Sequence, residues 1–153
     1  MSTSRPEKET VFVLNGPNLN LLGVREPQTY GSATLDDVEK LCRERADEEG
    51  LSVEFRQTNH EGVMIDWIQE ARERAAGIIV NPAGLTSTSI ATLDALLAVS
   101  LPVIEVHVTN IHRREEFRHF SYISQAATTV IAGAGTHGYQ IALSHMARLV
   151  RAD

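Results

Sequence analysis

Short apolar runs rich in β-branched residues alternate along this chain with segments whose apolar residues recur at helical spacing. The runs that predict strands lie at residues 11–14, 51–55, 77–80, 103–108 and 129–132. The segments that predict helices lie at residues 34–50, 64–71, 90–97 and 141–150. Strands that alternate with helices over short connections form parallel sheets with helices on both faces. The alternation therefore predicts an α/β fold with one parallel sheet of five strands.

Five parallel strands in a chain of this length favour the flavodoxin-like strand order 2-1-3-4-5. In such sheets a ligand binds beyond the carboxyl ends of the strands, near the point where the strand order reverses. That point lies between the first and third strands. We therefore look for the chemistry of this protein in the segments that directly follow each strand.

Composition sets the broad class of the protein. Of its 153 residues, 42% are hydrophobic and 22% are charged, which is ordinary for a globular domain. We expect a polar tail over residues 1–10 and a single domain over residues 11–153. The formal net charge of -6 leaves no broad basic surface for nucleic acid or for an anionic membrane. No apolar run approaches the ~20 residues of a membrane span, and none resembles a secretion signal, so we expect a cytoplasmic protein.

Polar residues gather where the first, third and fourth predicted strands end. The first strand leads into a long loop that carries Arg25 and Tyr30. The third leads into residues 81–89, where several hydrogen-bond donors lie near the start of a helix, a favourable place for an anion. The fourth carries Glu105 and His107 two residues apart, and therefore on one face. Because these strands are parallel, we expect all of these residues at one edge of the sheet.

Each of these candidates also has a purely structural interpretation. A loop tyrosine such as Tyr30 usually only packs, and a single histidine such as His107 is commonly a core residue with satisfied hydrogen bonds. Arg113, Arg114 and Arg118, which follow the fourth strand, are typical of a solvated face. What favours function is that a phenol, several arginines, a histidine and several amides all map to the same edge.

The residue types restrict the chemistry. No group of residues has metal-ligand spacing, and Cys42 lies on an apolar helical stripe, so we expect it to be inert. The only lysines are Lys8, in the tail, and Lys40, inside a helix, which leaves no amine for a Schiff base. Proton abstraction beside a carbonyl would then pass through an enolate. Tyr30 could act as its base if a permanent cation such as Arg25 stabilised the phenolate.

These residues belong to a longer set of motifs. The motifs are Asn15-Gly-Pro-Asn-Leu-Asn-Leu-Leu-Gly with Arg25-Glu-Pro and Tyr30-Gly, Phe55-Arg-Gln-Thr-Asn-His-Glu-Gly, Asp66-Trp-Ile-Gln, Val103-Ile-Glu-Val-His, Asn110-Ile-His, and Arg114-Glu-Glu-Phe-Arg with Ser121-Tyr. Over residues 11–148, and in this order, the chain resembles the type II 3-dehydroquinate dehydratases. The resemblance implies a hydro-lyase that converts 3-dehydroquinate to 3-dehydroshikimate, in the shikimate pathway or in quinate catabolism, without a metal or cofactor.

The same resemblance implies catalytic roles. Tyr30 is the base that takes a proton from the carbon beside the ketone, and Arg25 activates it. Asn18 helps to hold the water or oxygen that stabilises the enolate. His107 is the acid that protonates the departing hydroxyl, and Glu105 holds it.

Roles in substrate binding follow from the resemblance as well. Asn81 and the backbone at Val108 and Thr109 would bind the carboxylate region of the substrate. Arg118 would bind the ring hydroxyls. Arg114 would belong to a mobile lid, together with the arginine of the first loop.

The resemblance also implies a homo-oligomer, a dodecamer built from trimers, in which Asp94 reaches the site of a neighbouring subunit. The chain departs from the family pattern at two positions. Ser87 stands where the family has histidine in a Thr-His-Thr-Ser motif, and Leu93 stands where it has arginine directly before the aspartate. The first departure concerns substrate recognition and the second concerns the contact between subunits.

Other functions have less support from the sequence. Residues 133–138 match G-x-G-x-x-G, but a dinucleotide site needs a following strand and an acidic residue about 20 positions on, and the chain ends first. We therefore interpret these glycines as a strand-to-helix turn. A phosphoacceptor domain would need aspartates after the first strand, where this chain has asparagines. A paralogue that acts on, or only binds, a related cyclic hydroxy acid stays open as the alternative.

Overall fold

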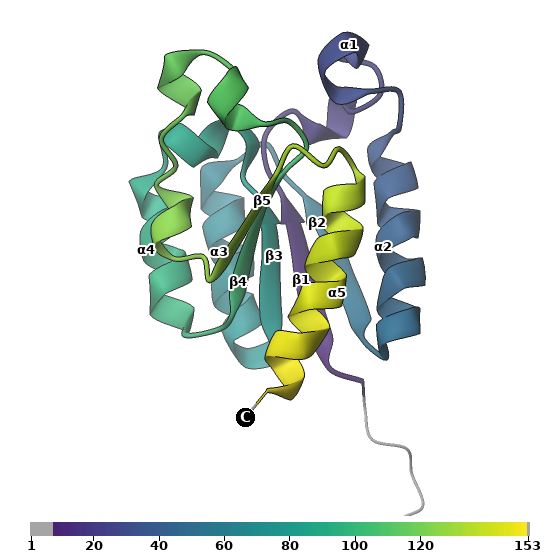
Figure 1. The fold of residues 1–153 in the computed structure, drawn as a ribbon. Coiled ribbons are helices and arrows are strands. Elements are labelled where there is room, and N and C mark those ends of the chain that lie inside the picture. The colour runs from purple at the N-terminus through teal and green to yellow at the C-terminus, as the bar shows by residue number, and fades with distance from the viewer. Residues whose placement is uncertain (1–7, 153) are drawn as a thin grey trace, which may run out of the picture.

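The structure, a computed structural model that describes residues 8–152, contains one sheet of five parallel strands (Figure 1). The strands are β1 Thr10–Asn15, β2 Ser52–Gln57, β3 Gly77–Asn81, β4 Val103–His107 and β5 Thr129–Ala132. Their order is β2-β1-β3-β4-β5, which confirms the predicted flavodoxin-like arrangement. β1 pairs with both β2 and β3, so the strand order reverses beside it.

Helices cover both faces of this sheet (Figure 1). The helices on the two faces are α2 Leu35–Glu49, α3 Glu61–Arg74, α4 Ile90–Val99 and α5 His137–Arg151. The short helix α1 Pro27–Tyr30 lies above the carboxyl edge of the sheet (Figure 1). Because side chains alternate along a strand, Val11 and Val13 pack with α2 and α5, whereas Phe12 and Leu14 pack with α3 and α4. None of the helices within residues 8–152 is long and apolar enough to cross a membrane.

α2 begins and ends at the residues that its local sequence predicts. The Thr34 hydroxyl accepts a hydrogen bond from the Asp37 N–H at 3.2 Å, and the Asp37 carboxylate accepts one from the Thr34 N–H at 3.0 Å. Gly50 ends the helix at φ 73°, in the left-handed region. Cys42 is buried in the core beside Val38, and this burial raises the pKa of its thiol to about 12. The predicted place of Cys42 on the buried apolar stripe of this helix is confirmed.

The predicted tail needs one correction. Thr10 was assigned to the tail, but it is the first residue of β1, where it pairs with Ser52 and places its hydroxyl oxygen 2.9 Å from the Ser52 hydroxyl oxygen. The strand is longer than its apolar run because backbone pairing continues through a polar residue. Most of the remaining predicted tail, residues 1–7, lies outside the described residues.

α4 is present as predicted, but two of its apolar residues lie on its outer side. Leu93 is only 7% exposed, whereas Ile90 and Leu97 are each 55% exposed. The buried face of the helix instead runs through Thr92, Leu96 and Val99. The spacing of the apolar residues therefore predicted the helix correctly, but it did not predict which of its faces is buried.

Two loops at the carboxyl edge of the sheet approach each other closely at Gly16. The Gly16 N–H donates to the Asn81 carbonyl at 2.9 Å, which ties the loop after β1 to the end of β3. A Cβ added at Gly16 would lie 2.4 Å from the Pro82 carbonyl oxygen. Only glycine allows this approach, which brings the two loops to one place.

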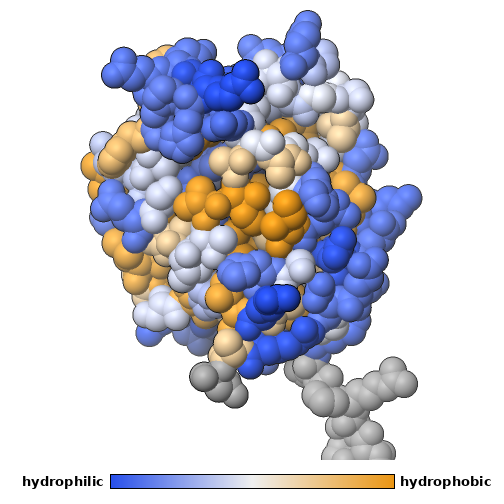
Figure 2. All heavy atoms as spheres, viewed as in Figure 1, coloured by the Kyte–Doolittle hydropathy of each residue, from blue (hydrophilic) through white to orange (hydrophobic). Residues whose placement is uncertain are grey.

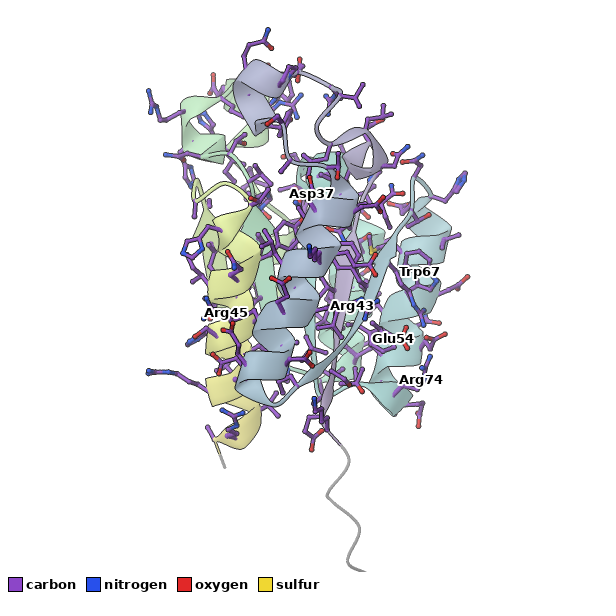
Figure 3. All side chains as sticks on the ribbon, turned by 90° about the vertical axis from the view of Figure 1, so that its right-hand side faces the viewer. Asp37, Arg43, Arg45, Glu54, Trp67 and Arg74 are labelled. Carbon is purple, nitrogen blue, oxygen red and sulfur yellow. The ribbon has the colours of Figure 1, made fainter. Side chains whose placement is uncertain are left out.

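The outer edge of the sheet, at β2, is held by charged side chains of β2 and α3. Arg56 and Arg74 each contact both Glu54 and Glu70, and Figure 3 shows Glu54 and Arg74 side by side below Trp67. The Arg56 guanidinium also lies 5.5 Å from the centre of the Trp67 ring. These contacts join the middle of β2 to the last turns of α3.

Candidate functional site

A cavity of about 240 Å³ lies at the carboxyl ends of the strands. It lies between α1 and the segment that joins β4 to β5, which rise on either side of this edge in Figure 1. The predicted site residues that line it are Asn18, Arg25, Tyr30, Asn81, Ser87, His107, Val108, Thr109, Arg114 and Arg118. The structure therefore brings together all the predicted residues except Asp94 and Glu105.

Two arginines flank the phenol of Tyr30, which ends α1. Arg114 donates a hydrogen bond from Nη1 to the Tyr30 hydroxyl oxygen at 2.7 Å, and its guanidinium lies 5.3 Å from the ring centre. The Arg25 guanidinium lies 5.5 Å from the same ring centre, and its nearest carboxylate, Glu26, is 3.8 Å away. Arg25, the cation that the sequence analysis placed near the Tyr30 phenol, does lie beside its ring. The direct hydrogen bond, however, comes from Arg114, which the resemblance placed only in a lid.

The loop that carries Asn18 is held by the segment after β2. The Asn18 N–H donates to Oδ1 of Asn59 at 2.9 Å, and Gln57 donates to the same oxygen at 3.1 Å and to the Gly16 carbonyl at 3.2 Å. Asn18 has φ 71°, a left-handed conformation that asparagine adopts more readily than most residues. Its backbone is fixed, and its side chain lines the cavity.

Behind the cavity, His107 contacts a carboxylate that is fully buried. His107 is 5% exposed, and its Nε2 is hydrogen-bonded to Oε2 of Glu105. Ser121 donates to the same oxygen at 2.8 Å, and Ser124 donates to Oε1 at 2.7 Å. Burial alone would raise the pKa of Glu105, but the hydrogen bonds from His107, Ser124 and Ser121 together lower it below its usual value. Glu105 is therefore ionised and hydrogen-bonded to the imidazole, the contact that the family resemblance implied, and their shared face agrees with their spacing of two residues.

Asn81 and Ser87 make contacts that the sequence did not predict. The Asn81 amide nitrogen donates to the Tyr139 hydroxyl at 2.8 Å, and its amide oxygen accepts from the Ala83 N–H at 3.3 Å. Ser87 donates its only hydroxyl proton to the Phe120 carbonyl at 2.8 Å. Toward the cavity, Ser87 can therefore only accept a hydrogen bond.

The segment after β4 forms the opposite wall. Arg118 lines the cavity, donates to Oε2 of Glu115 at 2.9 Å, and lies 4.9 Å from the centre of the Phe117 ring. Phe117 is 68% exposed at the rim. Asp94 is exposed on α4 and does not line the cavity of its own chain.

Sequence reasoning assigned no role to five polar residues around the cavity. Thr86 lines it with a buried hydroxyl that has no hydrogen-bond partner among residues 8–152. Ser121 and Ser124 hold Glu105, and Asn15 and Tyr139 lie beneath Asn81. A tyrosine on an otherwise apolar helix face was an available signal, because a buried phenol needs a hydrogen-bond partner.

The glycine-rich segment lies apart from this cavity. Gly133 and Gly135 adopt φ 91° and φ 63° in the connection from β5 to α5, and neither lines the cavity. The interpretation as a strand-to-helix turn is confirmed. Within residues 8–152, no three histidine, cysteine or acidic side chains come together as a metal site would require.

Comparisons with known proteins agree on one family. Residues 9–147 match the family described as dehydroquinase class II. A protein of Pseudomonas putida named 3-dehydroquinate dehydratase 2 is 57% identical over 144 residues, which are 94% of this chain and 97% of the relative. A 3-dehydroquinate dehydratase of Methylobacterium radiotolerans is 60% identical over 141 residues, 92% of this chain and 95% of the relative. The crystal structure of a type II dehydroquinase from Butyrivibrio crossotus is similar, with a TM-score of 0.89 at 40% identity, and covers 92% of this chain and 98% of that chain.

The buried carboxylate leads to a prediction about acid stability. Because the pKa of Glu105 is lower in the folded chain than in the unfolded chain, its contribution to stability is present at neutral pH. That contribution is lost as the pH falls below about 4.5 toward the folded value. We expect Glu105→Gln to lower the free energy of unfolding by roughly 1.5–3 kcal/mol at pH 7, as for hydrogen bonds to charged groups. The difference should shrink as the pH falls.

Urea unfolding of the unaltered chain and of Glu105→Gln at several pH values from 7 down to about 3 measures this difference. Glu73→Gln makes the same chemical change at an exposed position of α3 and serves as the control. A gap between Glu105→Gln and the unaltered chain that stays constant over this pH range would contradict the prediction.

Proposed function

Because the chain belongs to the class II dehydroquinase family, we propose that it dehydrates 3-dehydroquinate to 3-dehydroshikimate through an enolate. Its relatives at 57% and 60% identity are hydro-lyases by name, and the chain is an enzyme of this kind. The observation that carries the proposed mechanism is that the Tyr30–Arg114 pair and the Glu105–His107 pair meet at one cavity. The product would enter the shikimate pathway or quinate catabolism. The cytoplasmic location expected from the sequence stays a prediction.

Tyr30 is the base of the proposed first step. As phenolate it takes a proton from the carbon beside the ketone, and the electron pair of the C–H bond moves toward the ketone oxygen to form an enolate. The contact with Arg114 at 2.7 Å and the cation of Arg25 over the ring support a phenolate, because nearby positive charge stabilises the ionised form. Asn18 helps to hold the water or oxygen that stabilises the enolate.

His107 is the acid of the second step. The enolate electrons return to form the ring double bond, the bond from carbon to the hydroxyl breaks, and His107 gives its proton so that the group leaves as water. Glu105 supports this role because an ionised carboxylate stabilises the imidazolium that must be present beforehand. Tyr30 then returns its proton through solvent to His107, which restores both groups.

The remaining cavity residues are proposed to bind the substrate. Asn81 and the backbone at Val108 and Thr109 would bind the carboxylate region, and Arg118 would bind ring hydroxyls. Their position on one cavity supports a shared role in binding, and the division between them follows the family resemblance. Arg114 is proposed to have two roles. It belongs to the segment after β4, which would act as the lid, and it also donates a hydrogen bond to the hydroxyl of the base, Tyr30.

An enolate is favoured over a Schiff base because no lysine lies at the cavity. Lys40 lies on α2, where it lines a separate surface groove. The Nζ atom of Lys8 lies 3.3 Å from Oδ1 of Asp47, and Asp47 belongs to α2. The chain has no other lysine.

We expect Tyr30→Phe, Arg25→Ala and His107→Ala each to lower kcat by ~100- to 10,000-fold with a smaller effect on KM. The first removes the base, the second removes activating charge and the third removes the acid. Initial rates with dehydroquinate, followed by the ultraviolet absorbance of the conjugated enone product, measure this. Tyr122→Phe, which alters a tyrosine outside the cavity, is the control. Weaker binding with preserved turnover would contradict these assignments.

We propose that the enzyme assembles as a dodecamer built from trimers. Exposed apolar residues support an interface: Figure 2 shows an apolar patch on the face that carries β5, where Val130 is 47% and Ile141 is 38% exposed. Ile90 and Leu97 add exposed apolar surface on α4. Leu93, which replaces the family arginine, is buried within its own chain and offers no charge-assisted contact to a neighbour. Asp94, exposed on the same helix, would reach the neighbouring site.

Light scattering at micromolar concentration tests this assembly. We expect a particle much larger than a trimer, approaching twelve times the 16.8 kDa of one chain. A population of trimers would show that losing the arginine at Leu93 removes the contact between trimers. A population of monomers alone would rule out the proposed assembly.

Ser87 is the cavity residue at which the chain departs from the family pattern, and we expect it to affect substrate preference most. Its proton is donated to the Phe120 carbonyl, so it offers a ligand no donor, whereas the histidine of the family pattern can offer one. A ring hydroxyl facing Ser87 must therefore donate to it or bind through water. An unmatched polar group costs ~1–3 kcal/mol, which is roughly 5- to 150-fold in affinity or specificity, and a water bridge costs less.

We therefore expect Ser87→His to raise kcat/KM for dehydroquinate, and Ser87→Ala serves as the matched control that only removes the hydroxyl. Steady-state rates of the three proteins decide between the candidate functions. If Ser87→His abolishes a robust activity of the unaltered chain, the pocket is built around serine. If none of the three dehydrates dehydroquinate although all fold and assemble, the alternative holds, namely a paralogue for a related cyclic hydroxy acid.

A further inference from the structure

Three polar side chains form a continuous chain of hydrogen bonds beneath the floor of the cavity. Asn15, which ends β1, and Tyr139, in the first turn of α5, are fully buried, and Asn81, which ends β3, is 3% exposed. Tyr139 donates its hydroxyl proton to Oδ1 of Asn15 at 2.7 Å and accepts from Nδ2 of Asn81 at 2.8 Å. Only Asn81 of the three lines the cavity.

The direction of this chain is set at both ends by backbone groups. At one end, Nδ2 of Asn15 donates to the Arg56 carbonyl on β2 at 3.0 Å, and a carbonyl can only accept. Oδ1 of Asn15 must therefore face Tyr139. At the other end, the Ala83 N–H can only donate, and it donates to Oδ1 of Asn81 at 3.3 Å. Nδ2 of Asn81 must therefore face Tyr139 as well.

Between these ends, the linking group has to donate once and accept once. A hydroxyl does both, so the Tyr139 side chain can link the two asparagines by itself. Burial raises the pKa of Tyr139, so the hydroxyl keeps its proton at neutral pH and stays a donor to Asn15. If the Asn81 amide were turned over, its nitrogen would face the Ala83 N–H and both of its present hydrogen bonds would be lost.

From this geometry we infer that Tyr139 and Asn15 are positioning residues that make the Asn81 amide present a donor to the substrate. The second hydrogen on Nδ2 of Asn81 has no acceptor among residues 8–152, which leaves it for a ligand oxygen such as a carboxylate oxygen. A turned amide would instead present its oxygen, which repels a carboxylate. The inference rests on the proposed substrate-binding role of Asn81.

Kinetics of Tyr139→Phe test the inference, because this change removes the hydroxyl and keeps the ring. We expect KM for dehydroquinate to rise roughly 3- to 15-fold, as for one misplaced hydrogen bond, while kcat changes less than about threefold. Tyr122→Phe, the same change outside the cavity, should leave both constants within about twofold. A Tyr139→Phe enzyme with an unchanged KM would overturn the inference.

A double variant separates positioning from a general structural effect. If Tyr139 acts through Asn81, adding Tyr139→Phe to Asn81→Ala should change kcat/KM by less than about twofold, because the side chain that it orients is already gone. An equal loss in both backgrounds would show that Tyr139 supports the site in another way, and would overturn the inference.

Hydrogen exchange tests the same chain without relying on turnover. In protein labelled with nitrogen-15 at asparagine, the side-chain amide protons of Asn15 and Asn81 should exchange slowly, and Tyr139→Phe should speed both at least about tenfold. Tyr122→Phe should not. Unchanged exchange would refute the positioning role even in a fully active enzyme. If the unaltered chain does not dehydrate dehydroquinate but the exchange rates are as expected, the proposed function is contradicted. The inference that Tyr139 and Asn15 orient the Asn81 amide is then still supported.

Discussion

The parallel pairing of β1 with both β2 and β3 is the constraint on which the rest of the structure depends. It places β1 between two neighbours, and its last residue, Asn15, stands in register with Gln57 on one side and Asn81 on the other. Parallel strands end at the same edge, so their loops must leave the sheet together. The contact between Gly16 and the end of β3 draws these loops close enough to enclose a cavity.

Between the apolar core and this cavity lies a layer of buried polar groups, and each named member is held by partners from other elements. Glu105 is held by His107 and by two serines from the segment after β4. Asn15 and Asn81 are both hydrogen-bonded to Tyr139, and each also bonds to a backbone group. An unpaired buried charge or amide would cost more than its hydrogen bonds contribute. These hydrogen bonds therefore fix the directions of the buried side chains that support the groups at the cavity.

Charge is distributed unevenly in this molecule. The chain as a whole carries a formal net charge of -6, yet Arg25, Arg114 and Arg118 all line the cavity. Cations confined to a partly enclosed site act on each other and on a ligand more strongly than cations in water do. An anionic substrate can thus be bound locally by a protein that has no broad basic surface. Two of these cations, Arg25 and Arg114, lie 5.5 and 5.3 Å from the centre of the Tyr30 ring.

The sequence by itself determined the five strands and both ends of α2, because hydrophobic period and capping are local properties. The number of strands in a chain of this length favoured their order, and the family motifs supplied many of the predicted cavity residues. The sequence did not determine the inward face of α4, because that depends on what packs against the helix. Nor did it determine which arginine bonds to Tyr30. Arg114 lies 84 residues away along the chain, and Tyr139 lies 124 residues from Asn15. Only the tertiary structure brings such groups within hydrogen-bond distance, since the directions of their side chains depend on the packing of the whole sheet.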